Sequence, residues 1–268
     1  MVIIGEKINA SIPEIRQAII NREGEKLRTV AREQVNAGAR FIDINVGTGE
    51  GSAQDEIRSM QWIIGLLHDE IDGFFCIDSA DTEVLEAGLR KGTGKVGLVN
   101  SVKATDASIA EILALSAEFK VPVIGLAMDE TGIPTDAAGR LRACEKIAMG
   151  AEQFGVPLDH IYFDPLVLPV STDASQGRVT LETLREIKKR FAGAKTVLAV
   201  SNVSFGLPSR SRVNTALLQM AMFLSVDAVL VNPLDPSITA AIRAAEVILG
   251  RDRHCRRYTR AYRQGLFK

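Results

Sequence analysis

Eight short apolar runs recur along the chain, and each ends at polar residues and is followed by a stretch with helical spacing. The runs lie at residues 2–4, 41–44, 74–77, 96–99, 123–127, 161–163, 196–200 and 229–231. Continuous apolar strands that alternate with helices are typical of a parallel sheet covered on both faces. Eight such units in 268 residues predict an α/β fold, a single (β/α)8 TIM barrel, whose active site would lie where the strands end.

Composition limits the classes of protein to which the chain can belong. With 268 residues, 46% of them hydrophobic, the chain is long enough for one large core, so we expect one domain over residues 1–268. The 32 Lys+Arg and 33 Asp+Glu give a net charge of −1, which argues against a nucleic-acid-binding face. No apolar run approaches the ~20 residues that span a bilayer, so we expect no membrane association.

The cysteines and the beginning of the chain indicate a cytoplasmic location. Cys76, Cys144 and Cys255 are far apart in the sequence, which argues against a disulfide framework, a zinc site or a redox dithiol. Charged residues Glu6 and Lys7 follow after only three apolar residues, unlike a signal peptide.

Residues 251–268 form a basic segment in which arginines alternate with two tyrosines. The arginines are Arg251, Arg253, Arg256, Arg257, Arg260 and Arg263. We expect a solvated terminal helix that packs Tyr258 and Tyr262. The alternative is an electrostatic contact with an acidic ligand tail or partner.

Amphipathic stretches and long connections complete the expected barrel. Helical spacing of apolar residues occurs at 52–70, 107–119, 181–191 and 212–224. The last of these is nearly apolar throughout, which predicts burial against a neighbour as well as against the barrel. The longest connections follow the second, fifth, sixth and seventh runs, and long loops often carry function. The glycine-rich loop 47–51 lacks the Lys-Ser/Thr ending of a phosphate-binding P-loop.

A single polar residue at a strand end is ambiguous, because Asp, Asn and Thr often cap the helix that follows. We assign a capping role to one set: Asp81, Thr105, Asp106 and Thr180. A second set is left open between structural support and ligand contact: Asp43, Asn45, Asp129 and Asn232.

Asp78, Asn100 and Asp164 are more informative, because two carboxylates and an amide end the third, fourth and sixth runs. Carboxylates accept paired hydrogen bonds, whereas an amide both donates and accepts. Such a set suits the edge of a flat heterocycle that carries an amine, a ring N–H and a carbonyl. Metal binding is the competing use of two aspartates. Without a histidine ligand motif or a calcium loop, we expect no directly bound metal.

The pair Ser201-Asn202 ends the seventh run. The sequence has no Gly-x-Ser-x-Gly nucleophile elbow, and no lysine stands at a strand end as a Schiff-base candidate. An asparagine amide can act as donor or acceptor, which suits the stabilisation of charge that develops on a ring nitrogen during a reaction. The alternative is that Asn202 only supports the following loop.

Taken together, the motifs are identified as those of the pterin-binding barrel family. They are Gly5-Glu6-Lys7-Ile8-Asn9, Asp43-Ile44-Asn45-Val46-Gly47, Ile77-Asp78-Ser79, Val99-Asn100-Ser101, Met128-Asp129-Glu130-Thr131-Gly132-Ile133-Pro134, Phe163-Asp164-Pro165 and Ser201-Asn202-Val203-Ser204-Phe205-Gly206. Within this family the chain most resembles the methyltetrahydrofolate:corrinoid methyltransferases. The resemblance is closest to the methylcobalamin:tetrahydrofolate methyltransferases of quaternary-amine (glycine betaine) demethylation.

The resemblance implies a role for each motif residue. Asp78, Asn100 and Asp164 would hold the pterin pyrimidine edge, and Asn202 would lie near N5 as the catalytic residue. The remaining pocket residues would be Ser201, Met128, Arg210, Glu6, Asn9 and Asp43. Phe205 stands where a polar side chain is expected in acetyl-CoA-pathway relatives, so the rim or the approach of the corrinoid would differ.

The resemblance also implies the reaction and the partners. The substrate would be tetrahydrofolate or methyltetrahydrofolate, and methylcobalamin, free or on a corrinoid protein, would donate or accept the methyl group. We expect transfer toward methyltetrahydrofolate by a homodimer. A dihydropteroate synthase-like enzyme is the nearest rival, but it would need a lysine near residues 201–205, where none occurs. A non-catalytic folate-binding subunit is the second alternative.

Overall fold

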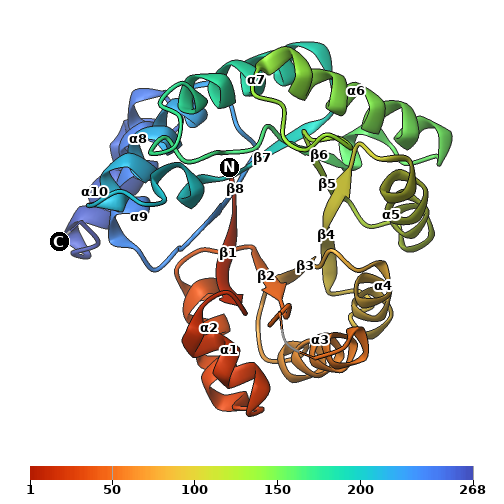
Figure 1. The fold of residues 1–268 in the computed structure, drawn as a ribbon. Helices are drawn as coiled ribbons and strands as arrows, with labels where there is room; N and C mark the ends of the chain where they lie inside the picture. Colours follow the sequence, from red (N-terminus) through yellow and green to blue (C-terminus); the bar gives the residue numbers. More distant parts are fainter. Residues whose placement is uncertain (50, 268) are drawn as a thin grey trace.

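The eight predicted strands form one closed parallel barrel with helices on its outside, which confirms the expected fold (Figure 1). The computed structural model describes residues 1–49 and 51–267, so Glu50 of the glycine-rich loop and Lys268 of the basic segment lie outside the described residues. The strands are β1 (Val2–Asn9), β2 (Phe41–Asn45), β3 (Phe74–Asp78), β4 (Val96–Lys103), β5 (Val123–Leu126), β6 (Ile161–Asp164), β7 (Lys195–Ala199) and β8 (Ala228–Val231). Because β1 pairs with both β2 and β8, the sheet has no free edge.

The helices follow the strands in order and surround the barrel (Figure 1). They are α1 (Pro13–Ile20), α2 (Gly24–Asn36), α3 (Ala53–Leu67), α4 (Thr82–Lys91), α5 (Asp106–Phe119), α6 (Ala137–Gln153), α7 (Gln176–Arg190), α8 (Arg210–Phe223), α9 (Pro236–Ile248) and α10 (Arg256–Arg263). Short 3-10 helices are η1 (Leu158–His160), η2 (Val200–Ser204) and η3 (Arg253–Cys255).

The interior of the barrel is filled by one apolar layer. Seven strands each contribute one buried side chain to it: Ile4, Cys76, Leu98, Ile124, Tyr162, Val197 and Ala228. Phe41 of β2 packs against this layer, and Asp43, two residues further along β2, is the register partner of Cys76. Since successive side chains of a strand point to opposite faces, the residue two positions beyond this layer also faces the interior.

A glycine in β1 shows how closely the helices approach the strands. Gly5 follows the interior residue Ile4 and therefore faces outward, toward α2. A Cβ atom at this position would lie 2.5 Å from the Oε1 atom of Gln34. That same Oε1 atom accepts a hydrogen bond from the backbone N–H of Lys7 at 2.9 Å, so the fully buried Gln34 joins α2 to β1.

Two of the four predicted helix caps are confirmed and two are wrong. The carboxylate of Asp81 accepts from the Glu83 N–H before α4, and the hydroxyl of Thr105 accepts from the Ser108 N–H before α5. Asp106 is the first residue of α5 rather than its cap. Thr180 lies inside α7, which begins four residues earlier at Gln176, and its buried hydroxyl donates to the Leu166 carbonyl at 2.9 Å.

Helix α8 is less buried than its apolar sequence predicted. Leu217, Leu218, Ala221 and Met222 are buried, which confirms packing on the barrel side. On the other side of the helix Phe223 is 72% exposed and Met220 is 54% exposed. The expected burial against a neighbour is found at α9, whose Ile238, Ala241 and Ile242 share one apolar cluster with the buried residues of α8. The outer face of the helix stays exposed among the described residues.

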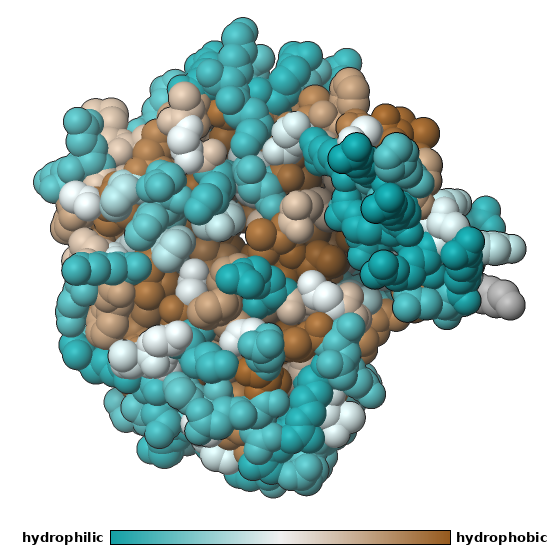
Figure 2. Space-filling view, turned by 180° about the vertical axis from the view of Figure 1, so that it is seen from behind, coloured by the Kyte–Doolittle hydropathy of each residue, from teal (hydrophilic) through white to brown (hydrophobic). Residues whose placement is uncertain are grey.

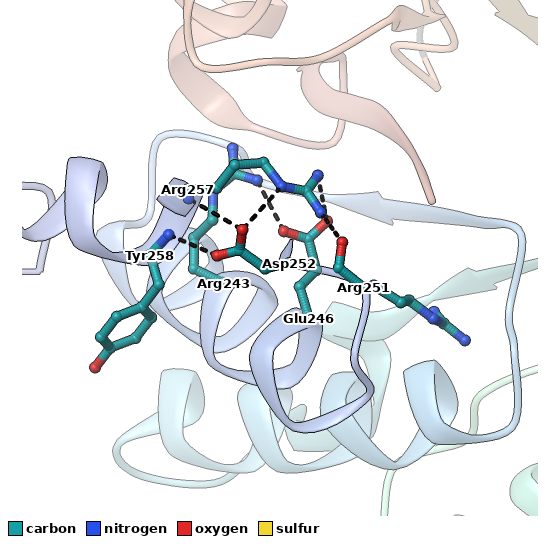
Figure 3. A network of polar contacts seen from close by, with 6 residues as sticks. All are labelled: Arg243, Glu246, Arg251, Asp252, Arg257 and Tyr258. Atoms are coloured by element: carbon teal, nitrogen blue, oxygen red, sulfur yellow. Dashed lines mark hydrogen bonds and ion pairs between the residues drawn. The ribbon is translucent and has the colours of Figure 1, made fainter. Parts of the chain in front are cut away.

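The basic C-terminal segment is attached to α9 by polar contacts. Both oxygens of Asp252 accept backbone N–H groups at the start of α10, from Arg257 at 3.1 Å and from Tyr258 at 2.9 Å (Figure 3). Glu246 of α9 forms ion pairs with Arg243 and Arg257. Figure 2 shows the segment as a strongly hydrophilic projection. Tyr258 contacts the Phe267 ring, whereas Tyr262 is 67% exposed, so the expected packing holds for one tyrosine.

No helix among residues 1–49 and 51–267 has both the length and the apolar character needed to cross a bilayer.

The apolar interior layer predicts a large difference between two isoleucine substitutions. Ile4→Ala removes a fully buried side chain from the middle of the barrel and should lower the free energy of unfolding by about 2–5 kcal/mol. Ile248→Ala truncates a side chain that is 84% exposed and should change the free energy of unfolding by less than about 0.5 kcal/mol. Urea denaturation of both variants checks this. Equal effects would contradict the assignment of Ile4 to the interior layer.

Candidate active site

The side chains immediately beyond the apolar layer form a ring at the open end of the barrel. Two residues past each interior residue the strands carry Glu6, Asp78, Asn100, Leu126, Asp164, Ala199 and Leu230. Asn45 of β2 is the register partner of Asp78, which in turn is the partner of Asn100, and so it faces the same way. We call this set the inward ring. It is polar on β1–β4 and β6 and apolar on β5, β7 and β8.

Hydrogen bonds join the polar residues of β2, β3 and β4 into one cluster. The Asn45 amide donates to Asp78 Oδ2 at 2.9 Å, and the Asn100 amide lies 3.5 Å from Asp43 Oδ1. Asp43 is 1% exposed and lies one interior level below Asn45. The structure therefore brings the predicted residues Asp78, Asn100 and Asp43 together, with Asn45 as an additional member.

The two carboxylates of this cluster are hard to ionise at the same time. Burial raises the pKa of Asp43 well above its usual 3.8, and the nearby charge of Asp78 raises it further, although hydrogen bonds from Cys76 and Asn100 oppose the shift. Burial also raises the pKa of Asp78, against the hydrogen bond from Asn45. Two close carboxylates in a low-dielectric site favour sharing a proton.

Asp164 faces the interior from β6, apart from the cluster on β2–β4. It is 6% exposed, and its Oδ1 atom accepts the Leu166 N–H at 2.8 Å. Its other oxygen has no hydrogen-bond partner among residues 1–49 and 51–267. Burial raises the pKa of this carboxyl to about 7, while the Leu166 hydrogen bond and the charge of Arg140 oppose the shift. A buried carboxylate with a free acceptor is suited to a ligand that donates N–H groups.

A third group of polar residues links β1 to the segment after β7. The hydroxyl of Ser201 donates to Glu6 Oε2 at 3.1 Å. Arg210, the first residue of α8, donates to the Ser201 carbonyl at 2.7 Å and to the Ser204 hydroxyl at 3.0 Å, and so holds the backbone of η2. Burial raises the pKa of Glu6, although Ser201, Lys7 and Arg210 lower it.

Asn202, Met128 and Asn9 lie around the opening rather than on the inward ring. The Asn202 side chain projects from η2, is exposed, and makes no recorded hydrogen bond within the described residues. Met128 is half-buried just past β5. The Asn9 Oδ1 atom accepts the Ser11 N–H at 2.8 Å, which leaves its amide nitrogen available.

The residues whose role the sequence left open divide in the structure. Asp129 is held in a local turn, accepting the backbone N–H of Thr131 at 2.8 Å and its hydroxyl at 2.6 Å. Asn232 accepts the Leu234 N–H at 3.1 Å in a similar turn. Asn45 has both roles, because its Oδ1 atom accepts the Gly47 N–H while its amide holds Asp78.

An open cavity of about 1120 Å³ adjoins the inward ring at Asn45 and Asp78. It extends over the starts of α3 and α4 and past Gly47 and Gly49 of the glycine-rich loop. A molecule held by the inward ring therefore has room to extend beyond it. In the described part of the chain no group of three or more His, Cys, Asp or Glu side chains is placed to hold a metal ion.

Arg140 and Gln176 are functional candidates that the sequence reasoning missed. Both are fully buried beneath the loops that follow β5 and β6, and the Arg140 guanidinium donates to Gln176 Oε1 at 2.7 Å. The available signal was the helical spacing of Arg140 with the buried residues Ala143, Cys144 and Ile147, which places an arginine on the apolar stripe of α6.

The chain is similar in sequence to known proteins over most of its length. The family model described as "Pterin binding enzyme" matches residues 6–232. A methylcorrinoid:tetrahydrofolate methyltransferase from Eubacterium limosum is 31% identical over 270 residues, covering 99% of this chain and 97% of that protein. The methionine synthase of Mycobacterium tuberculosis is 29% identical over 245 residues, which cover 87% of this chain but 20% of that protein.

Among solved structures, the barrel is similar to dihydropteroate synthases. That of Yersinia pestis, with a pterine-sulfa conjugate, superposes with a TM-score of 0.71 at 17% identity, covering 93% of this chain and 94% of that one. The enzyme from Vibrio fischeri gives 0.68 at 19% identity, covering 93% of each. At these identities the similarity shows the shared fold.

The raised pKa of Asp164 predicts a pH-dependent gain in stability from Asp164→Asn. The unfolded carboxyl titrates near 3.8 and the folded one near 7, so its favourable contribution is complete below pH ~4 and is lost as the pH rises through about 7. The free energy of unfolding of the asparagine variant should therefore equal that of the wild type at pH ~4 and be up to about 4 kcal/mol larger at pH ~8.

Urea denaturation across this pH range measures the difference in unfolding free energy. Asp129→Asn is the control, because hydrogen bonds from Thr131 lower the pKa of that exposed carboxyl. This substitution should therefore leave stability unchanged or reduce it above pH ~4, whereas Asp164→Asn should increase it. A difference between wild type and Asp164→Asn that does not grow with pH would contradict the burial of an ionisable Asp164.

Proposed function

The chain belongs to the pterin-binding enzyme family, and from this premise we propose that it is a methyltransferase that moves a methyl group between a methylated corrinoid and N5 of tetrahydrofolate. The family predicted from the motifs is confirmed by the match over residues 6–232. The near full-length similarity to a methylcorrinoid:tetrahydrofolate methyltransferase supports the reaction proposed.

The observation that carries the proposal is the chemistry of the inward ring. Asp164 presents a buried carboxylate from β6, Asp78 a half-buried one from β3, and Asn100 a half-buried amide from β4. These groups complement the amine, ring N–H and carbonyl of a pterin pyrimidine edge. In the proposal they hold that edge, and the apolar side chains Leu126, Ala199 and Leu230 contact the ring faces.

Asn202 would act on the reacting nitrogen. A neutral tertiary amine is a poor leaving group, so N5 must gain positive character when methyltetrahydrofolate loses its methyl group. An amide that hydrogen-bonds N5 stabilises this change, and the proton would come from water. In the reverse direction N5 attacks the methyl group, and Asn202 stabilises the same transition state. Within residues 1–49 and 51–267 the Asn202 amide has no hydrogen-bond partner, which supports this role.

The remaining predicted residues would support these contacts. Asp43 would hold Asn100 from below, and Glu6 would hold the Ser201 hydroxyl. Arg210 would fix the backbone that carries Asn202. Met128 and Asn9 would line the rim of the pocket.

The second reactant would be a corrinoid protein or free cobalamin, approaching the open end of the barrel. The exposure of Asn202 and of Phe205, at 64%, leaves this side accessible to a large molecule. We further propose transfer toward methyltetrahydrofolate by a cytoplasmic homodimer.

Methyl transfer between methylcobalamin and tetrahydrofolate is the first test. Purified protein, methylcobalamin and tetrahydrofolate are mixed without oxygen, and the corrinoid spectrum and methyltetrahydrofolate are followed together. We expect both to change in proportion to enzyme. Bound pterin without transfer in either direction would support a folate-binding subunit instead. Formation of dihydropteroate from a dihydropterin pyrophosphate and p-aminobenzoate would support the rival synthase.

Substitutions should separate binding from catalysis. Asn202→Ala should slow transfer by about 10²-fold and weaken folate binding by less than about tenfold. Asp78→Asn should instead weaken binding by about 10–100-fold, because it removes a charged acceptor. Calorimetry gives the Kd, and single-turnover kinetics give the rate of transfer.

Asn36→Ala is the matched control, since this exposed asparagine ends α2 at the opposite end of the barrel. It should leave both quantities unchanged. Full activity of Asn202→Ala would exclude the role proposed for that amide.

A further inference from the structure

In the described part of the chain, the Arg140 guanidinium is a buried cation without a hydrogen-bonded carboxylate. Its side chain is 0% exposed, in the first turn of α6. It donates to the carbonyls of Pro134 at 3.0 Å, Pro165 at 2.9 Å and Leu166 at 2.8 Å, and to Gln176 Oε1 at 2.7 Å. All of these acceptors are neutral. A buried charge normally has a paired counter-charge, because desolvation costs several kcal/mol.

These acceptors belong to the two loops next to Asp164. Pro134 lies in the loop that follows β5, whereas Pro165 and Leu166 follow directly after Asp164. Leu166 has a φ of +64°, a left-handed conformation that is strained for leucine. Its carbonyl accepts from Arg140 and Thr180, and its N–H donates to Asp164. The guanidinium therefore helps to hold the backbone that orients the Asp164 carboxylate.

The charge of Arg140 also acts on Asp164. The titratable groups that face Asp164 in the described residues are the Arg140 guanidinium and the Cys144 thiol, both on α6, and Asp136 faces the guanidinium in turn. Asp136 is already engaged in capping α6, where it accepts the Gly139 N–H at 2.6 Å. Because Gln176 is an amide and not a carboxylate, the positive charge beside Asp164 is not cancelled at short range.

We propose that Arg140 is a positioning residue for pterin recognition, which holds the loops after β5 and β6 in place and supplies the positive charge that keeps Asp164 an anionic acceptor. Gln176 is the neutral hydrogen-bond partner of Arg140. A carboxylate at this position would cancel the positive charge that acts on Asp164, so the partner has to be neutral. The inference rests on the proposed function in taking Asp164 as a pterin contact. The effect of the Arg140 charge on Asp164 can also be tested in the ligand-free protein, independently of that function.

The variant that tests the charge is Gln176→Glu combined with Asp173→Asn. The glutamate carboxylate would lie against the Arg140 guanidinium and cancel its charge, while the asparagine amide restores the hydrogen bond that Gln176 Nε2 now donates to Asp173 at 2.9 Å. Asp173→Asn alone is the matched control. Thr180→Val removes a hydroxyl that donates to the Leu166 carbonyl and accepts from Arg140 at 3.4 Å, but it leaves the charge in place, so it reports the structural contribution.

Carbon-13 NMR of the Asp164 carboxyl in the ligand-free full chain is the first readout, with the signal assigned by its loss in Asp164→Asn. The pH at the midpoint of the Asp164 titration should rise by about one unit in the double variant. It should stay unchanged in Asp173→Asn and in Thr180→Val. Equal midpoints in the double variant and Asp173→Asn would overturn the electrostatic role.

Tetrahydrofolate affinity between pH 6 and 9 is the second readout. If only the anionic Asp164 binds, the double variant should bind about fivefold more weakly than Asp173→Asn at pH 7 and equally well at pH 9. A loss that is the same at every pH would overturn the charge role in recognition. Failure of the wild type to bind tetrahydrofolate would instead contradict the proposed function, while the NMR midpoints would still test Arg140.

Discussion

Closure of the parallel sheet between β1 and β8 fixes the direction of every side chain on the strands. In a closed barrel a strand cannot rotate or slip by one residue without turning its apolar side chains away from the interior. The inward layer that contains Ile4 and Ile124 therefore determines which residues face inward two positions later. The polar character of the barrel opening follows from this register. The helices and loops add further residues around the inward ring, whose positions the strands determine.

The site concentrates groups that are costly to bury. Asp43, Asp78, Asp164 and Glu6 all have raised pKa values for which burial is the largest cause. A folded protein tolerates this because the apolar layer below and the helix-covered exterior supply stabilisation elsewhere. A ligand that donates hydrogen bonds to these carboxylates would offset part of their lost hydration, so the same desolvation that disfavours the free site favours its occupation.

The strands were predictable from the sequence because buried parallel strands are continuous apolar runs, and the interior polar residues follow them directly. Helix starts were less predictable. Thr180 resembled a cap because α7 begins with Gln176, Gly177 and Arg178, which carry no large apolar side chain, so the apolar helical spacing was recognised only from Leu181. Arg140 was missed for a different reason. Its partners are mostly backbone carbonyls from loops 127–136 and 165–175, and no side-chain pattern in the sequence shows where those carbonyls lie.

In the proposed reaction, recognition and catalysis depend on different kinds of structure in this barrel. Asp78, Asn100 and Asp164 belong to strands or end them, whereas Asn202 lies in a short 3-10 segment outside the sheet. Replacing that segment would leave the hydrogen-bonded frame of the sheet intact. A scaffold organised in this way can acquire new chemistry through changes in one peripheral peptide while it keeps its preference for the same class of heterocycle, which makes it a good starting point for divergent evolution and for laboratory redesign.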